Sequence, residues 1–362
     1  MSSKLRKLKS WYEENERRVS SFSLLAGFFF DSLTLKRVDS FFENFWLGIN
    51  LFAVALCITL INREDNIGEK KDSWKHFWLF NVLQFSFGAL LGASFIFYFR
   101  SAALSVSWPF LLVLLLAMVG NEAFKKHYER LIFQLSFLFL SIFVFFIFLL
   151  PVVFHKFGVS MFLLSGVASL IVLWGFTRLL HHFSREKFKK SGRRIWLSIF
   201  SIYALINILY FTNLIPPIPL SLKDAGIYHS VSVDSRGNYL VSEEDREGWG
   251  KYFELRQKVH LLSAEPLYAY AAIFSPGALN TQVVHEWQSE NEFGEWVTAS
   301  RIPISLAGGR VQGFRTYSTK SSLTPGRWRV NVETPRGQLI GRINFEVISV
   351  NTAPGLVTIV KD

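Results

Sequence analysis

The chain has 362 residues, of which 50% are hydrophobic and 19% are charged, and its formal net charge is +11. Soluble domains carry about 25% charged residues, so this composition excludes a purely cytosolic enzyme, a disordered regulator and a disulfide-rich secreted scaffold. The mean hydropathy is +0.27. Cys57 is the single cysteine, which rules out an intrachain disulfide and a thiolate metal cluster.

The positive charge is confined to the first part of the chain. Residues 1–216 hold 24 Lys and Arg against 13 Asp and Glu, whereas residues 217–362 hold 15 of each. A nucleic-acid-binding domain would carry its basic excess on a folded soluble surface. Here the excess lies between apolar segments, which is typical of membrane topology. We therefore expect the lipid bilayer as a partner, and no nucleic acid.

Apolar runs follow a basic N-terminus, residues 1–18, which we expect to be cytoplasmic. A helix needs about 20 apolar residues to cross a bilayer, and six runs reach that length. A seventh run, 19–35, is shorter and contains Asp31, and no small-residue cleavage site follows it, so we expect it to be retained. The sequence predicts a transmembrane helical domain over 19–216. Its expected spans are 19–35, 42–62, 76–99, 103–120, 131–154, 157–180 and 195–216.

Ionisable residues at membrane depth are candidates for function, because an unpaired charge there is costly. Asp31 is the residue of this kind farthest from a span end, and it could be a proton or ion site. The alternative interpretation is an interfacial Asp that ends a short helix. We find no paired Gly/Pro break inside a span and no inverted repeat, so a channel or pump is not favoured.

Hydrophobic residues alternate with period two after Pro216 and Pro217 end the last span. In 326–335, Trp328, Val330 and Val332 share one face. The opposite face holds Arg327, Arg329, Asn331 and Glu333. Other strand-like runs are 258–263, 267–273, 281–288, 295–306, 311–317 and 339–347. The sequence therefore predicts an all-β, antiparallel, sandwich-like soluble domain over 257–362, after a hairpin and polar linker over 217–256.

One set of residues in this domain could form a ligand-binding face. His285 and Trp287 lie two apart and share one face of a strand, as do Arg315 and Tyr317 on another. Arginine forks suit carboxylate or phosphate groups, and aromatic faces suit sugar rings. The full candidate set is His285, Trp287, Arg310, Arg315, Tyr317 and Lys320. The alternative interpretation is a core Trp, a hydrogen-bonded buried His and arginines that cover apolar edges.

The sequence contains no known catalytic or metal-binding spacing in the required context. The chain has no G-x-x-x-x-G-K-[ST] loop and no G-x-S-x-G turn, and its histidines lack metal-ligand spacing. We expect no cofactor and no bound metal, and name no catalytic residue.

The chain resembles a bacterial membrane-anchored family classified as domain of unknown function 2914. The resemblance lies in Gly27-Phe-Phe-Phe-Asp31, Leu33-Thr-Leu-Lys-Arg37, 226–230 (GIYHS), 285–287 (HEW), 308–315 (GGRVQGFR) continuing to Lys320, 325–330 (PGRWRV) and 341–345 (GRINF). It implies a multi-pass bundle in the bacterial inner membrane, followed by a periplasmic β domain. The family has no assigned activity, so the resemblance supplies no catalytic residues.

Two main functional hypotheses follow. In the first, the chain is an interaction protein whose periplasmic domain binds an envelope protein or a glycan. In the second, it is a membrane enzyme of envelope lipid or glycan modification, whose site would need polar residues at the outer ends of the spans. The only such cluster is Asp31, Lys36, Arg37, Asp39 and Glu43. A transporter is a third, less favoured alternative.

The charge distribution predicts the orientation of the chain in the membrane. With seven spans and a cytoplasmic N-terminus, 20 Lys and Arg fall inside and four outside, as the positive-inside rule requires. Alkaline phosphatase fused after Asp362 is therefore expected to be active, and a fusion after Lys190 inactive. The reverse pattern of activity would overturn this orientation.

Overall fold

The computed structural model describes residues 35, 40–67, 74–123, 130–217, 220–245, 256–262, 265–275, 281–306 and 314–361. The chain divides into two compact units. A helical unit comprises Met1–Arg100 and Pro109–Thr212, and a β unit comprises Ser101–Trp108 and Asn213–Asp362. Almost all of the first expected span, 19–35, lies outside the described residues. So do Asp31, Arg310, Lys36, Arg37 and Asp39.

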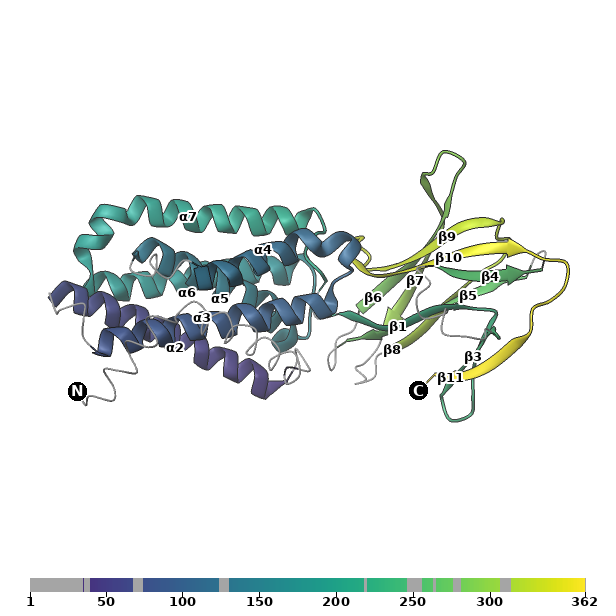
Figure 1. Ribbon diagram of the computed structural model, residues 1–362, viewed down its shortest axis with the longest axis horizontal. Coiled ribbons are helices and arrows are strands. Elements are labelled where there is room, and N and C mark those ends of the chain that lie inside the picture. The colour runs from purple at the N-terminus through teal and green to yellow at the C-terminus, as the bar shows by residue number, and fades with distance from the viewer. Residues whose placement is uncertain are drawn as a thin grey trace. The chain divides into compact units, whose positions relative to one another are not determined.

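Six helices of the described chain are long and apolar enough to cross a membrane (Figure 1). They are α2 (Phe41–Ile67), α3 (Trp74–Ser101), α4 (Leu104–Ala123), α5 (Leu131–Phe154), α6 (Val159–Phe183) and α7 (Arg185–Phe211). These helices confirm the six long runs expected from the sequence. The largest difference is at α7, whose first turns contain the basic residues that the sequence assigned to a loop before 195.

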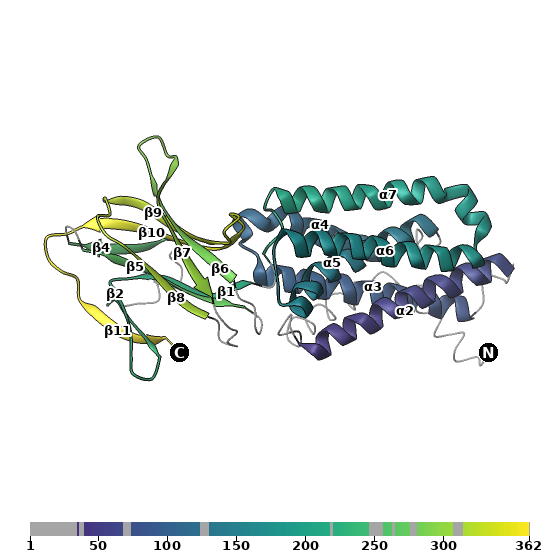
Figure 2. The same cartoon turned by 180° about the vertical axis from the view of Figure 1, so that it is seen from behind.

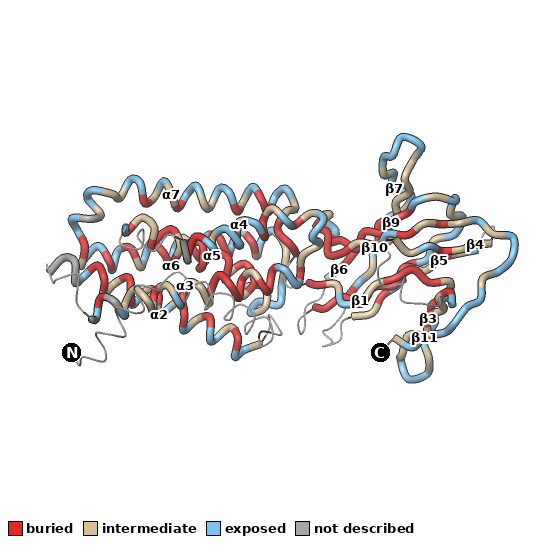
Figure 3. Tube along the Cα trace, in the orientation of Figure 1, coloured by how far each residue is buried: buried red, intermediate tan, exposed pale blue. Residues whose placement is uncertain are grey.

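Helix α5 is the central element of the helical unit and packs against α2, α6 and α7 (Figure 2). It has no charged residue, and most of its side chains are buried (Figure 3). Two of its polar side chains, Gln134 and Ser136, pair with polar groups of other helices. The Asn62 amide donates to Gln134 Oε1 at 2.8 Å, and Ser136 bonds Ser198 at 2.7 Å. Such pairing satisfies polar groups that lipid cannot.

The described residues of the β unit form three sheets. The strand order is β1-β5-β8 in sheet A, β11-β3-β2 in sheet B and β4-β10-β9-β6-β7 in sheet C. The strands of the β unit are β1 (Ser221–Tyr228), β2 (Ser230–Val233), β3 (Tyr239–Glu244), β4 (Gln257–Leu261), β5 (Leu267–Phe274), β6 (Thr281–Glu290), β7 (Trp296–Leu306), β8 (Phe314–Lys320), β9 (Gly326–Glu333), β10 (Leu339–Ser349) and β11 (Leu356–Lys361). The expected all-β fold is thus confirmed. Strands pair antiparallel, except that β4 runs parallel to β10.

Sheet A is covered on both faces. On one side, Ile227 and Ala269 pack with residues of sheet C such as Trp287 and Phe345. On the other side, tyrosines of sheet A pack with residues of sheet B. This second core consists of Tyr228, Val231, Val241, Tyr270 and Ala272. The central strand β5 is consequently buried over nearly its whole length (Figure 3), and the β unit has three layers.

A close approach and a tight turn depend on glycine. A Cβ at Gly341 of β10 would overlap the Leu222 side chain of β1, so any other residue there would require Leu222 to move. Gly337, with φ of +86°, occupies the left-handed position of the β9–β10 turn and donates to the Thr334 carbonyl at 2.8 Å. A tight turn over 334–337 therefore connects β9 to β10.

We predict that residues 220–362 fold without the helices, because both cores of the three-layer β arrangement lie within this segment and its formal charges balance. The purified fragment should show β-sheet circular dichroism and one cooperative thermal transition in detergent-free buffer. A fragment with neither property would contradict this prediction.

Candidate functional site

His285 and Trp287 lie together, as expected, but they point into the core between sheets A and C. Both side chains are fully buried. Ser318 of β8 joins them, because its Oγ accepts the Trp287 indole N–H at 3.0 Å and lies 2.9 Å from His285 Nδ1. The other ring nitrogen of His285 lies 3.4 Å from Thr316 Oγ1. His285, Trp287 and Ser318 therefore have their hydrogen-bond partners inside the core.

Burial lowers the pKa of His285 to about 4, since the charged imidazolium is disfavoured away from water. The ring is consequently neutral at physiological pH. A Ser beside a His can act as a nucleophile, but this Ser318 hydroxyl is buried and also accepts the Trp287 N–H. The arrangement is suited to fixing the core rather than to meeting a ligand.

Arg315 and Tyr317 lie on the opposite side of β8 from Ser318. Tyr317 is 40% exposed and contacts the rings of Tyr239 and Tyr268. The backbone carbonyl of Arg315 accepts the Tyr239 hydroxyl at 3.2 Å. The structure therefore separates the candidate set into two groups on opposite faces of β8. Lys320 is the last residue of β8, and it is half-buried.

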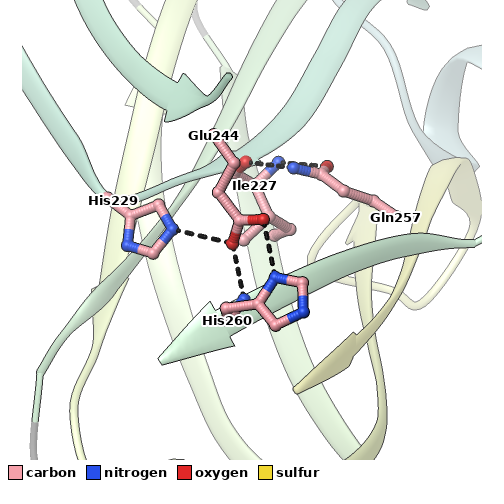
Figure 4. Close-up of polar contacts among 5 residues, drawn as sticks. All are labelled: Ile227, His229, Glu244, Gln257 and His260. Atoms are coloured by element: carbon pink, nitrogen blue, oxygen red, sulfur yellow. Dashed lines mark hydrogen bonds and ion pairs between the residues drawn. The ribbon is translucent and has the colours of Figure 1, made fainter. Parts of the chain in front are cut away.

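A second polar cluster joins strands of all three sheets around Glu244, the last residue of β3 (Figure 4). Its Oε1 lies 3.2 Å from His229 Nε2 and accepts the backbone N–H of His260 in β4. Its Oε2 lies 2.8 Å from His260 Nδ1. Beside it, the Gln257 amide donates to the Ile227 carbonyl at 2.7 Å and accepts the Ile227 N–H at 3.3 Å. These contacts tie β4 to β1 and β3.

The electrostatics of Glu244 are those of a buried, hydrogen-bonded carboxylate. Burial raises its pKa, but the hydrogen bonds from His260 and His229 outweigh this effect and leave the pKa below its ordinary value. The two histidines bind opposite oxygens of one carboxylate, and the described residues contain no group of three His, Cys, Asp or Glu placed to hold a metal ion. We therefore assign the cluster a structural role.

The outward side of sheet C carries the candidate functional site. We call it the polar face, and it consists of Glu286, Gln288, Arg329, Asn331, Glu333 and Arg342. Three of its members are almost fully covered, although they point away from the core: Glu286 is 8% exposed, Asn331 5% and Glu333 6%. Polar groups on the outside of a sheet are usually solvated. Here they are covered by other polar side chains.

Hydrogen bonds connect the polar face across four strands. The Asn331 amide of β9 donates to Glu286 Oε2 of β6 at 3.1 Å, and its Oδ1 accepts Arg342 Nε of β10 at 2.7 Å. Arg329 Nε donates to Gln288 Oε1 at 2.6 Å. On β7, Arg301 donates to Glu333 Oε1 at 2.6 Å. The side chains are thus held in fixed positions, as a preorganised binding surface requires.

Glu333 is the titratable member of this face. Burial, and to a lesser degree the Glu286 carboxylate, raise its pKa to about 7, while Arg301 opposes the shift. Trp296 lies at the edge of the face, with the Arg329 guanidinium 4.2 Å from its ring centroid. The face therefore combines carboxylate, amide, guanidinium and aromatic groups, which together can hydrogen-bond hydroxyls and oxyanions.

The strand alternation places Arg329, Asn331, Glu333 and Arg342 on the side opposite Trp328 in both the sequence and the structure. The sequence alone does not mark them as a site, because polar residues on a strand's outer face normally contact water. Their burial depends on cross-strand partners. Alternation could have identified the face, but not its hydrogen bonds.

Comparisons with known proteins match one segment of the chain. Residues 280–347 match a family described as protein of unknown function (DUF2914), and this segment includes every residue of the polar face. No curated protein matches the chain.

Two solved structures resemble the chain only weakly. One is β-glucosidase from Listeria innocua in complex with gluconolactone, with 14% identity over 30% of this chain and 16% of that chain, at a TM-score of 0.19. The other is the Pseudomonas fluorescens alkylpurine DNA glycosylase AlkC bound to DNA containing an abasic site analog. It has 10% identity over 86% of this chain and 99% of that chain, at a TM-score of 0.22. Similarity this low supports no conclusion about fold or function.

We predict that Glu244→Gln lowers the free energy of unfolding of the β unit by about 2 kcal/mol at neutral pH, because a buried carboxylate that accepts several hydrogen bonds is lost. The pKa of Glu244 is depressed in the folded state. Its contribution is therefore complete above the ordinary pKa and lost as the pH falls through the lower folded-state value. On acidification the wild type should lose more stability than Glu244→Gln.

The measurement is chemical unfolding of the detergent-solubilised chain at a series of pH values, followed by β-sheet circular dichroism. Glu243→Gln is the matched control, since Glu243 precedes Glu244 on β3 and faces the other way. Equal losses in the two variants would contradict the role assigned to Glu244.

Proposed function

We propose that the protein is a multi-pass inner-membrane protein that displays its β unit in the periplasm as a binding module for an envelope glycan or protein. Six membrane-length helices support the membrane location. The excess of Lys and Arg in the loops assigned to the inside supports the orientation, with the C-terminus outside.

The observation that carries this proposal is the polar face of sheet C. A sheet surface that only meets water does not need carboxylate and amide groups fixed by hydrogen bonds between side chains, because water satisfies these groups without ordering them. The buried Asn331 and Glu286 help to fix the partly exposed side chains of Gln288, Arg329 and Arg342, which offer donors and acceptors at defined spacing. Glycan recognition depends on such groups together with an aromatic side chain, which Trp296 provides at the edge.

A blocking experiment tests the proposal. Asn344 is exposed on the outward side of β10, two residues from Arg342 and opposite Arg329. The only native cysteine, Cys57, is buried, so Asn344→Cys can be labelled selectively with a bulky maleimide. The detergent-solubilised chain should bind members of an array of bacterial envelope glycans or purified peptidoglycan, and the label at 344 should abolish that binding because it covers the face.

Ser232→Cys, labelled in the same way, is the control, because Ser232 is exposed on β2 of sheet B. Binding that the label at 344 leaves intact would exclude the polar face as the binding surface. An absence of binding to every glycan probe would exclude the glycan and leave a protein as the expected partner.

A further inference from the structure

Two arginines of the polar face are oriented by neutral groups. Arg329 Nε donates to the side-chain carbonyl of Gln288, and Arg342 Nε donates to that of Asn331. A carboxylate acceptor would both orient a guanidinium and neutralise its charge, whereas an amide acceptor only orients it. The full positive charge of Arg329 and of Arg342 is therefore retained at fixed positions.

The remaining nitrogens of these guanidinium groups are available. Among the described residues, neither Arg329 nor Arg342 has a hydrogen-bond partner for its terminal nitrogens. The neighbouring arginines do have carboxylate partners. Arg301 pairs with Glu333 at 2.6 Å, and Arg327 pairs with Glu290 at 3.3 Å. Two guanidinium groups are thus left unpaired by carboxylates on this face.

The two guanidinium groups also lie close enough to interact. Arg342 is paired in register with Asn331, so Arg329, two residues away on β9, is its diagonal neighbour on the same face. Burial lowers the pKa of both arginines, and the charge of Arg342 lowers the pKa of Arg329 further. Glu286 is the carboxylate that acts favourably on both. Glu290 also acts favourably on Arg329, but it pairs with Arg327, so neither Arg329 nor Arg342 has a carboxylate partner of its own among the described residues.

We propose that Arg329 and Arg342 together bind an oxyanion, which is a carboxylate or phosphate group carried by the ligand of the polar face. A guanidinium fork presents two parallel N–H groups that match the oxygens of either group. An oxyanion between the two arginines would relieve their mutual repulsion and supply the missing acceptors. The inference rests on the proposed binding function and adds the charged group that this ligand carries.

The local surroundings favour this site over other basic positions in the β unit. Trp296 stacks on Arg329, which restricts the guanidinium plane and reduces the entropy lost on binding. The Asn331 amide that orients Arg342 is itself held by Glu286 Oε2 at 3.1 Å. Each arginine is therefore supported by a second residue that does not contact the oxyanion.

The test titrates the detergent-solubilised full chain with inorganic phosphate, with glucuronate and with glucose, by isothermal titration calorimetry at constant ionic strength. We expect saturable binding of phosphate, glucuronate or both, and none of glucose. Arg329→Gln and Arg342→Gln should each weaken binding by about tenfold or more, because each removes charge-assisted hydrogen bonds. Arg236→Gln, which removes one positive charge from the exposed β2–β3 turn, should leave binding unchanged.

The outcomes separate the sources of the oxyanion. Preference for glucuronate identifies a carboxylated sugar, and preference for phosphate identifies a phosphorylated ligand. Absence of anion binding, equal binding of glucose and glucuronate, or binding by both Gln variants that is as tight as that of the wild type would overturn the proposal.

Folding is checked by thermal unfolding of each variant. If Arg342→Gln does not fold, Arg342→Lys replaces it, since it keeps the charge and the aliphatic stem but loses the fork. Unchanged binding by Arg342→Lys would overturn the bidentate assignment. If the label at 344 blocks glycan binding but the chain binds no anion, only this inference is overturned. The proposed function then still stands.

Discussion

The central constraint on the β unit is that β5, the middle strand of sheet A, has no free face. Strand β5 contacts one core through residues such as Leu267 and Ala269, and the other through Tyr270 and Ala272. A strand buried on both sides cannot present polar side chains to a ligand without losing apolar contacts in one core or the other. Recognition is therefore left to the outer faces of sheets B and C, to the exposed side of β8 at Tyr317 and to the loops.

This constraint explains the outcome for the residues that the sequence nominated. Two-residue spacing correctly predicted that His285 and Trp287 share a face. Spacing alone does not say whether that face meets water or another sheet, because a Trp and a His suit both. The deciding partner is Ser318, which lies on β8 and satisfies both side chains inside the core. A contact between distant strands of this kind is set by the fold and has no local signal.

Strands with one buried face were the easiest to predict. In β9 and β10 the alternation is regular, and both were expected nearly at their observed bounds. Strand β1 carries Lys223 and Asp224 beside a register shift after Leu222, and β11 is largely exposed, so neither shows clear alternation. The Glu244 cluster could not be predicted from local sequence patterns either. Its residues Glu244, His229 and His260 come from separate segments, which only the packing of the sheets brings together.

The charge of the polar face depends on which acceptor holds each arginine. Gln288 and Asn331 hold Arg329 and Arg342 without neutralising them at any pH. Arg301 is different, because its acceptor is Glu333, whose pKa is about 7. When Glu333 takes up a proton, Arg301 loses its opposing charge, so the face is more positive below that pH than above it. The same network that orients the side chains therefore also sets how many cations an anionic ligand meets.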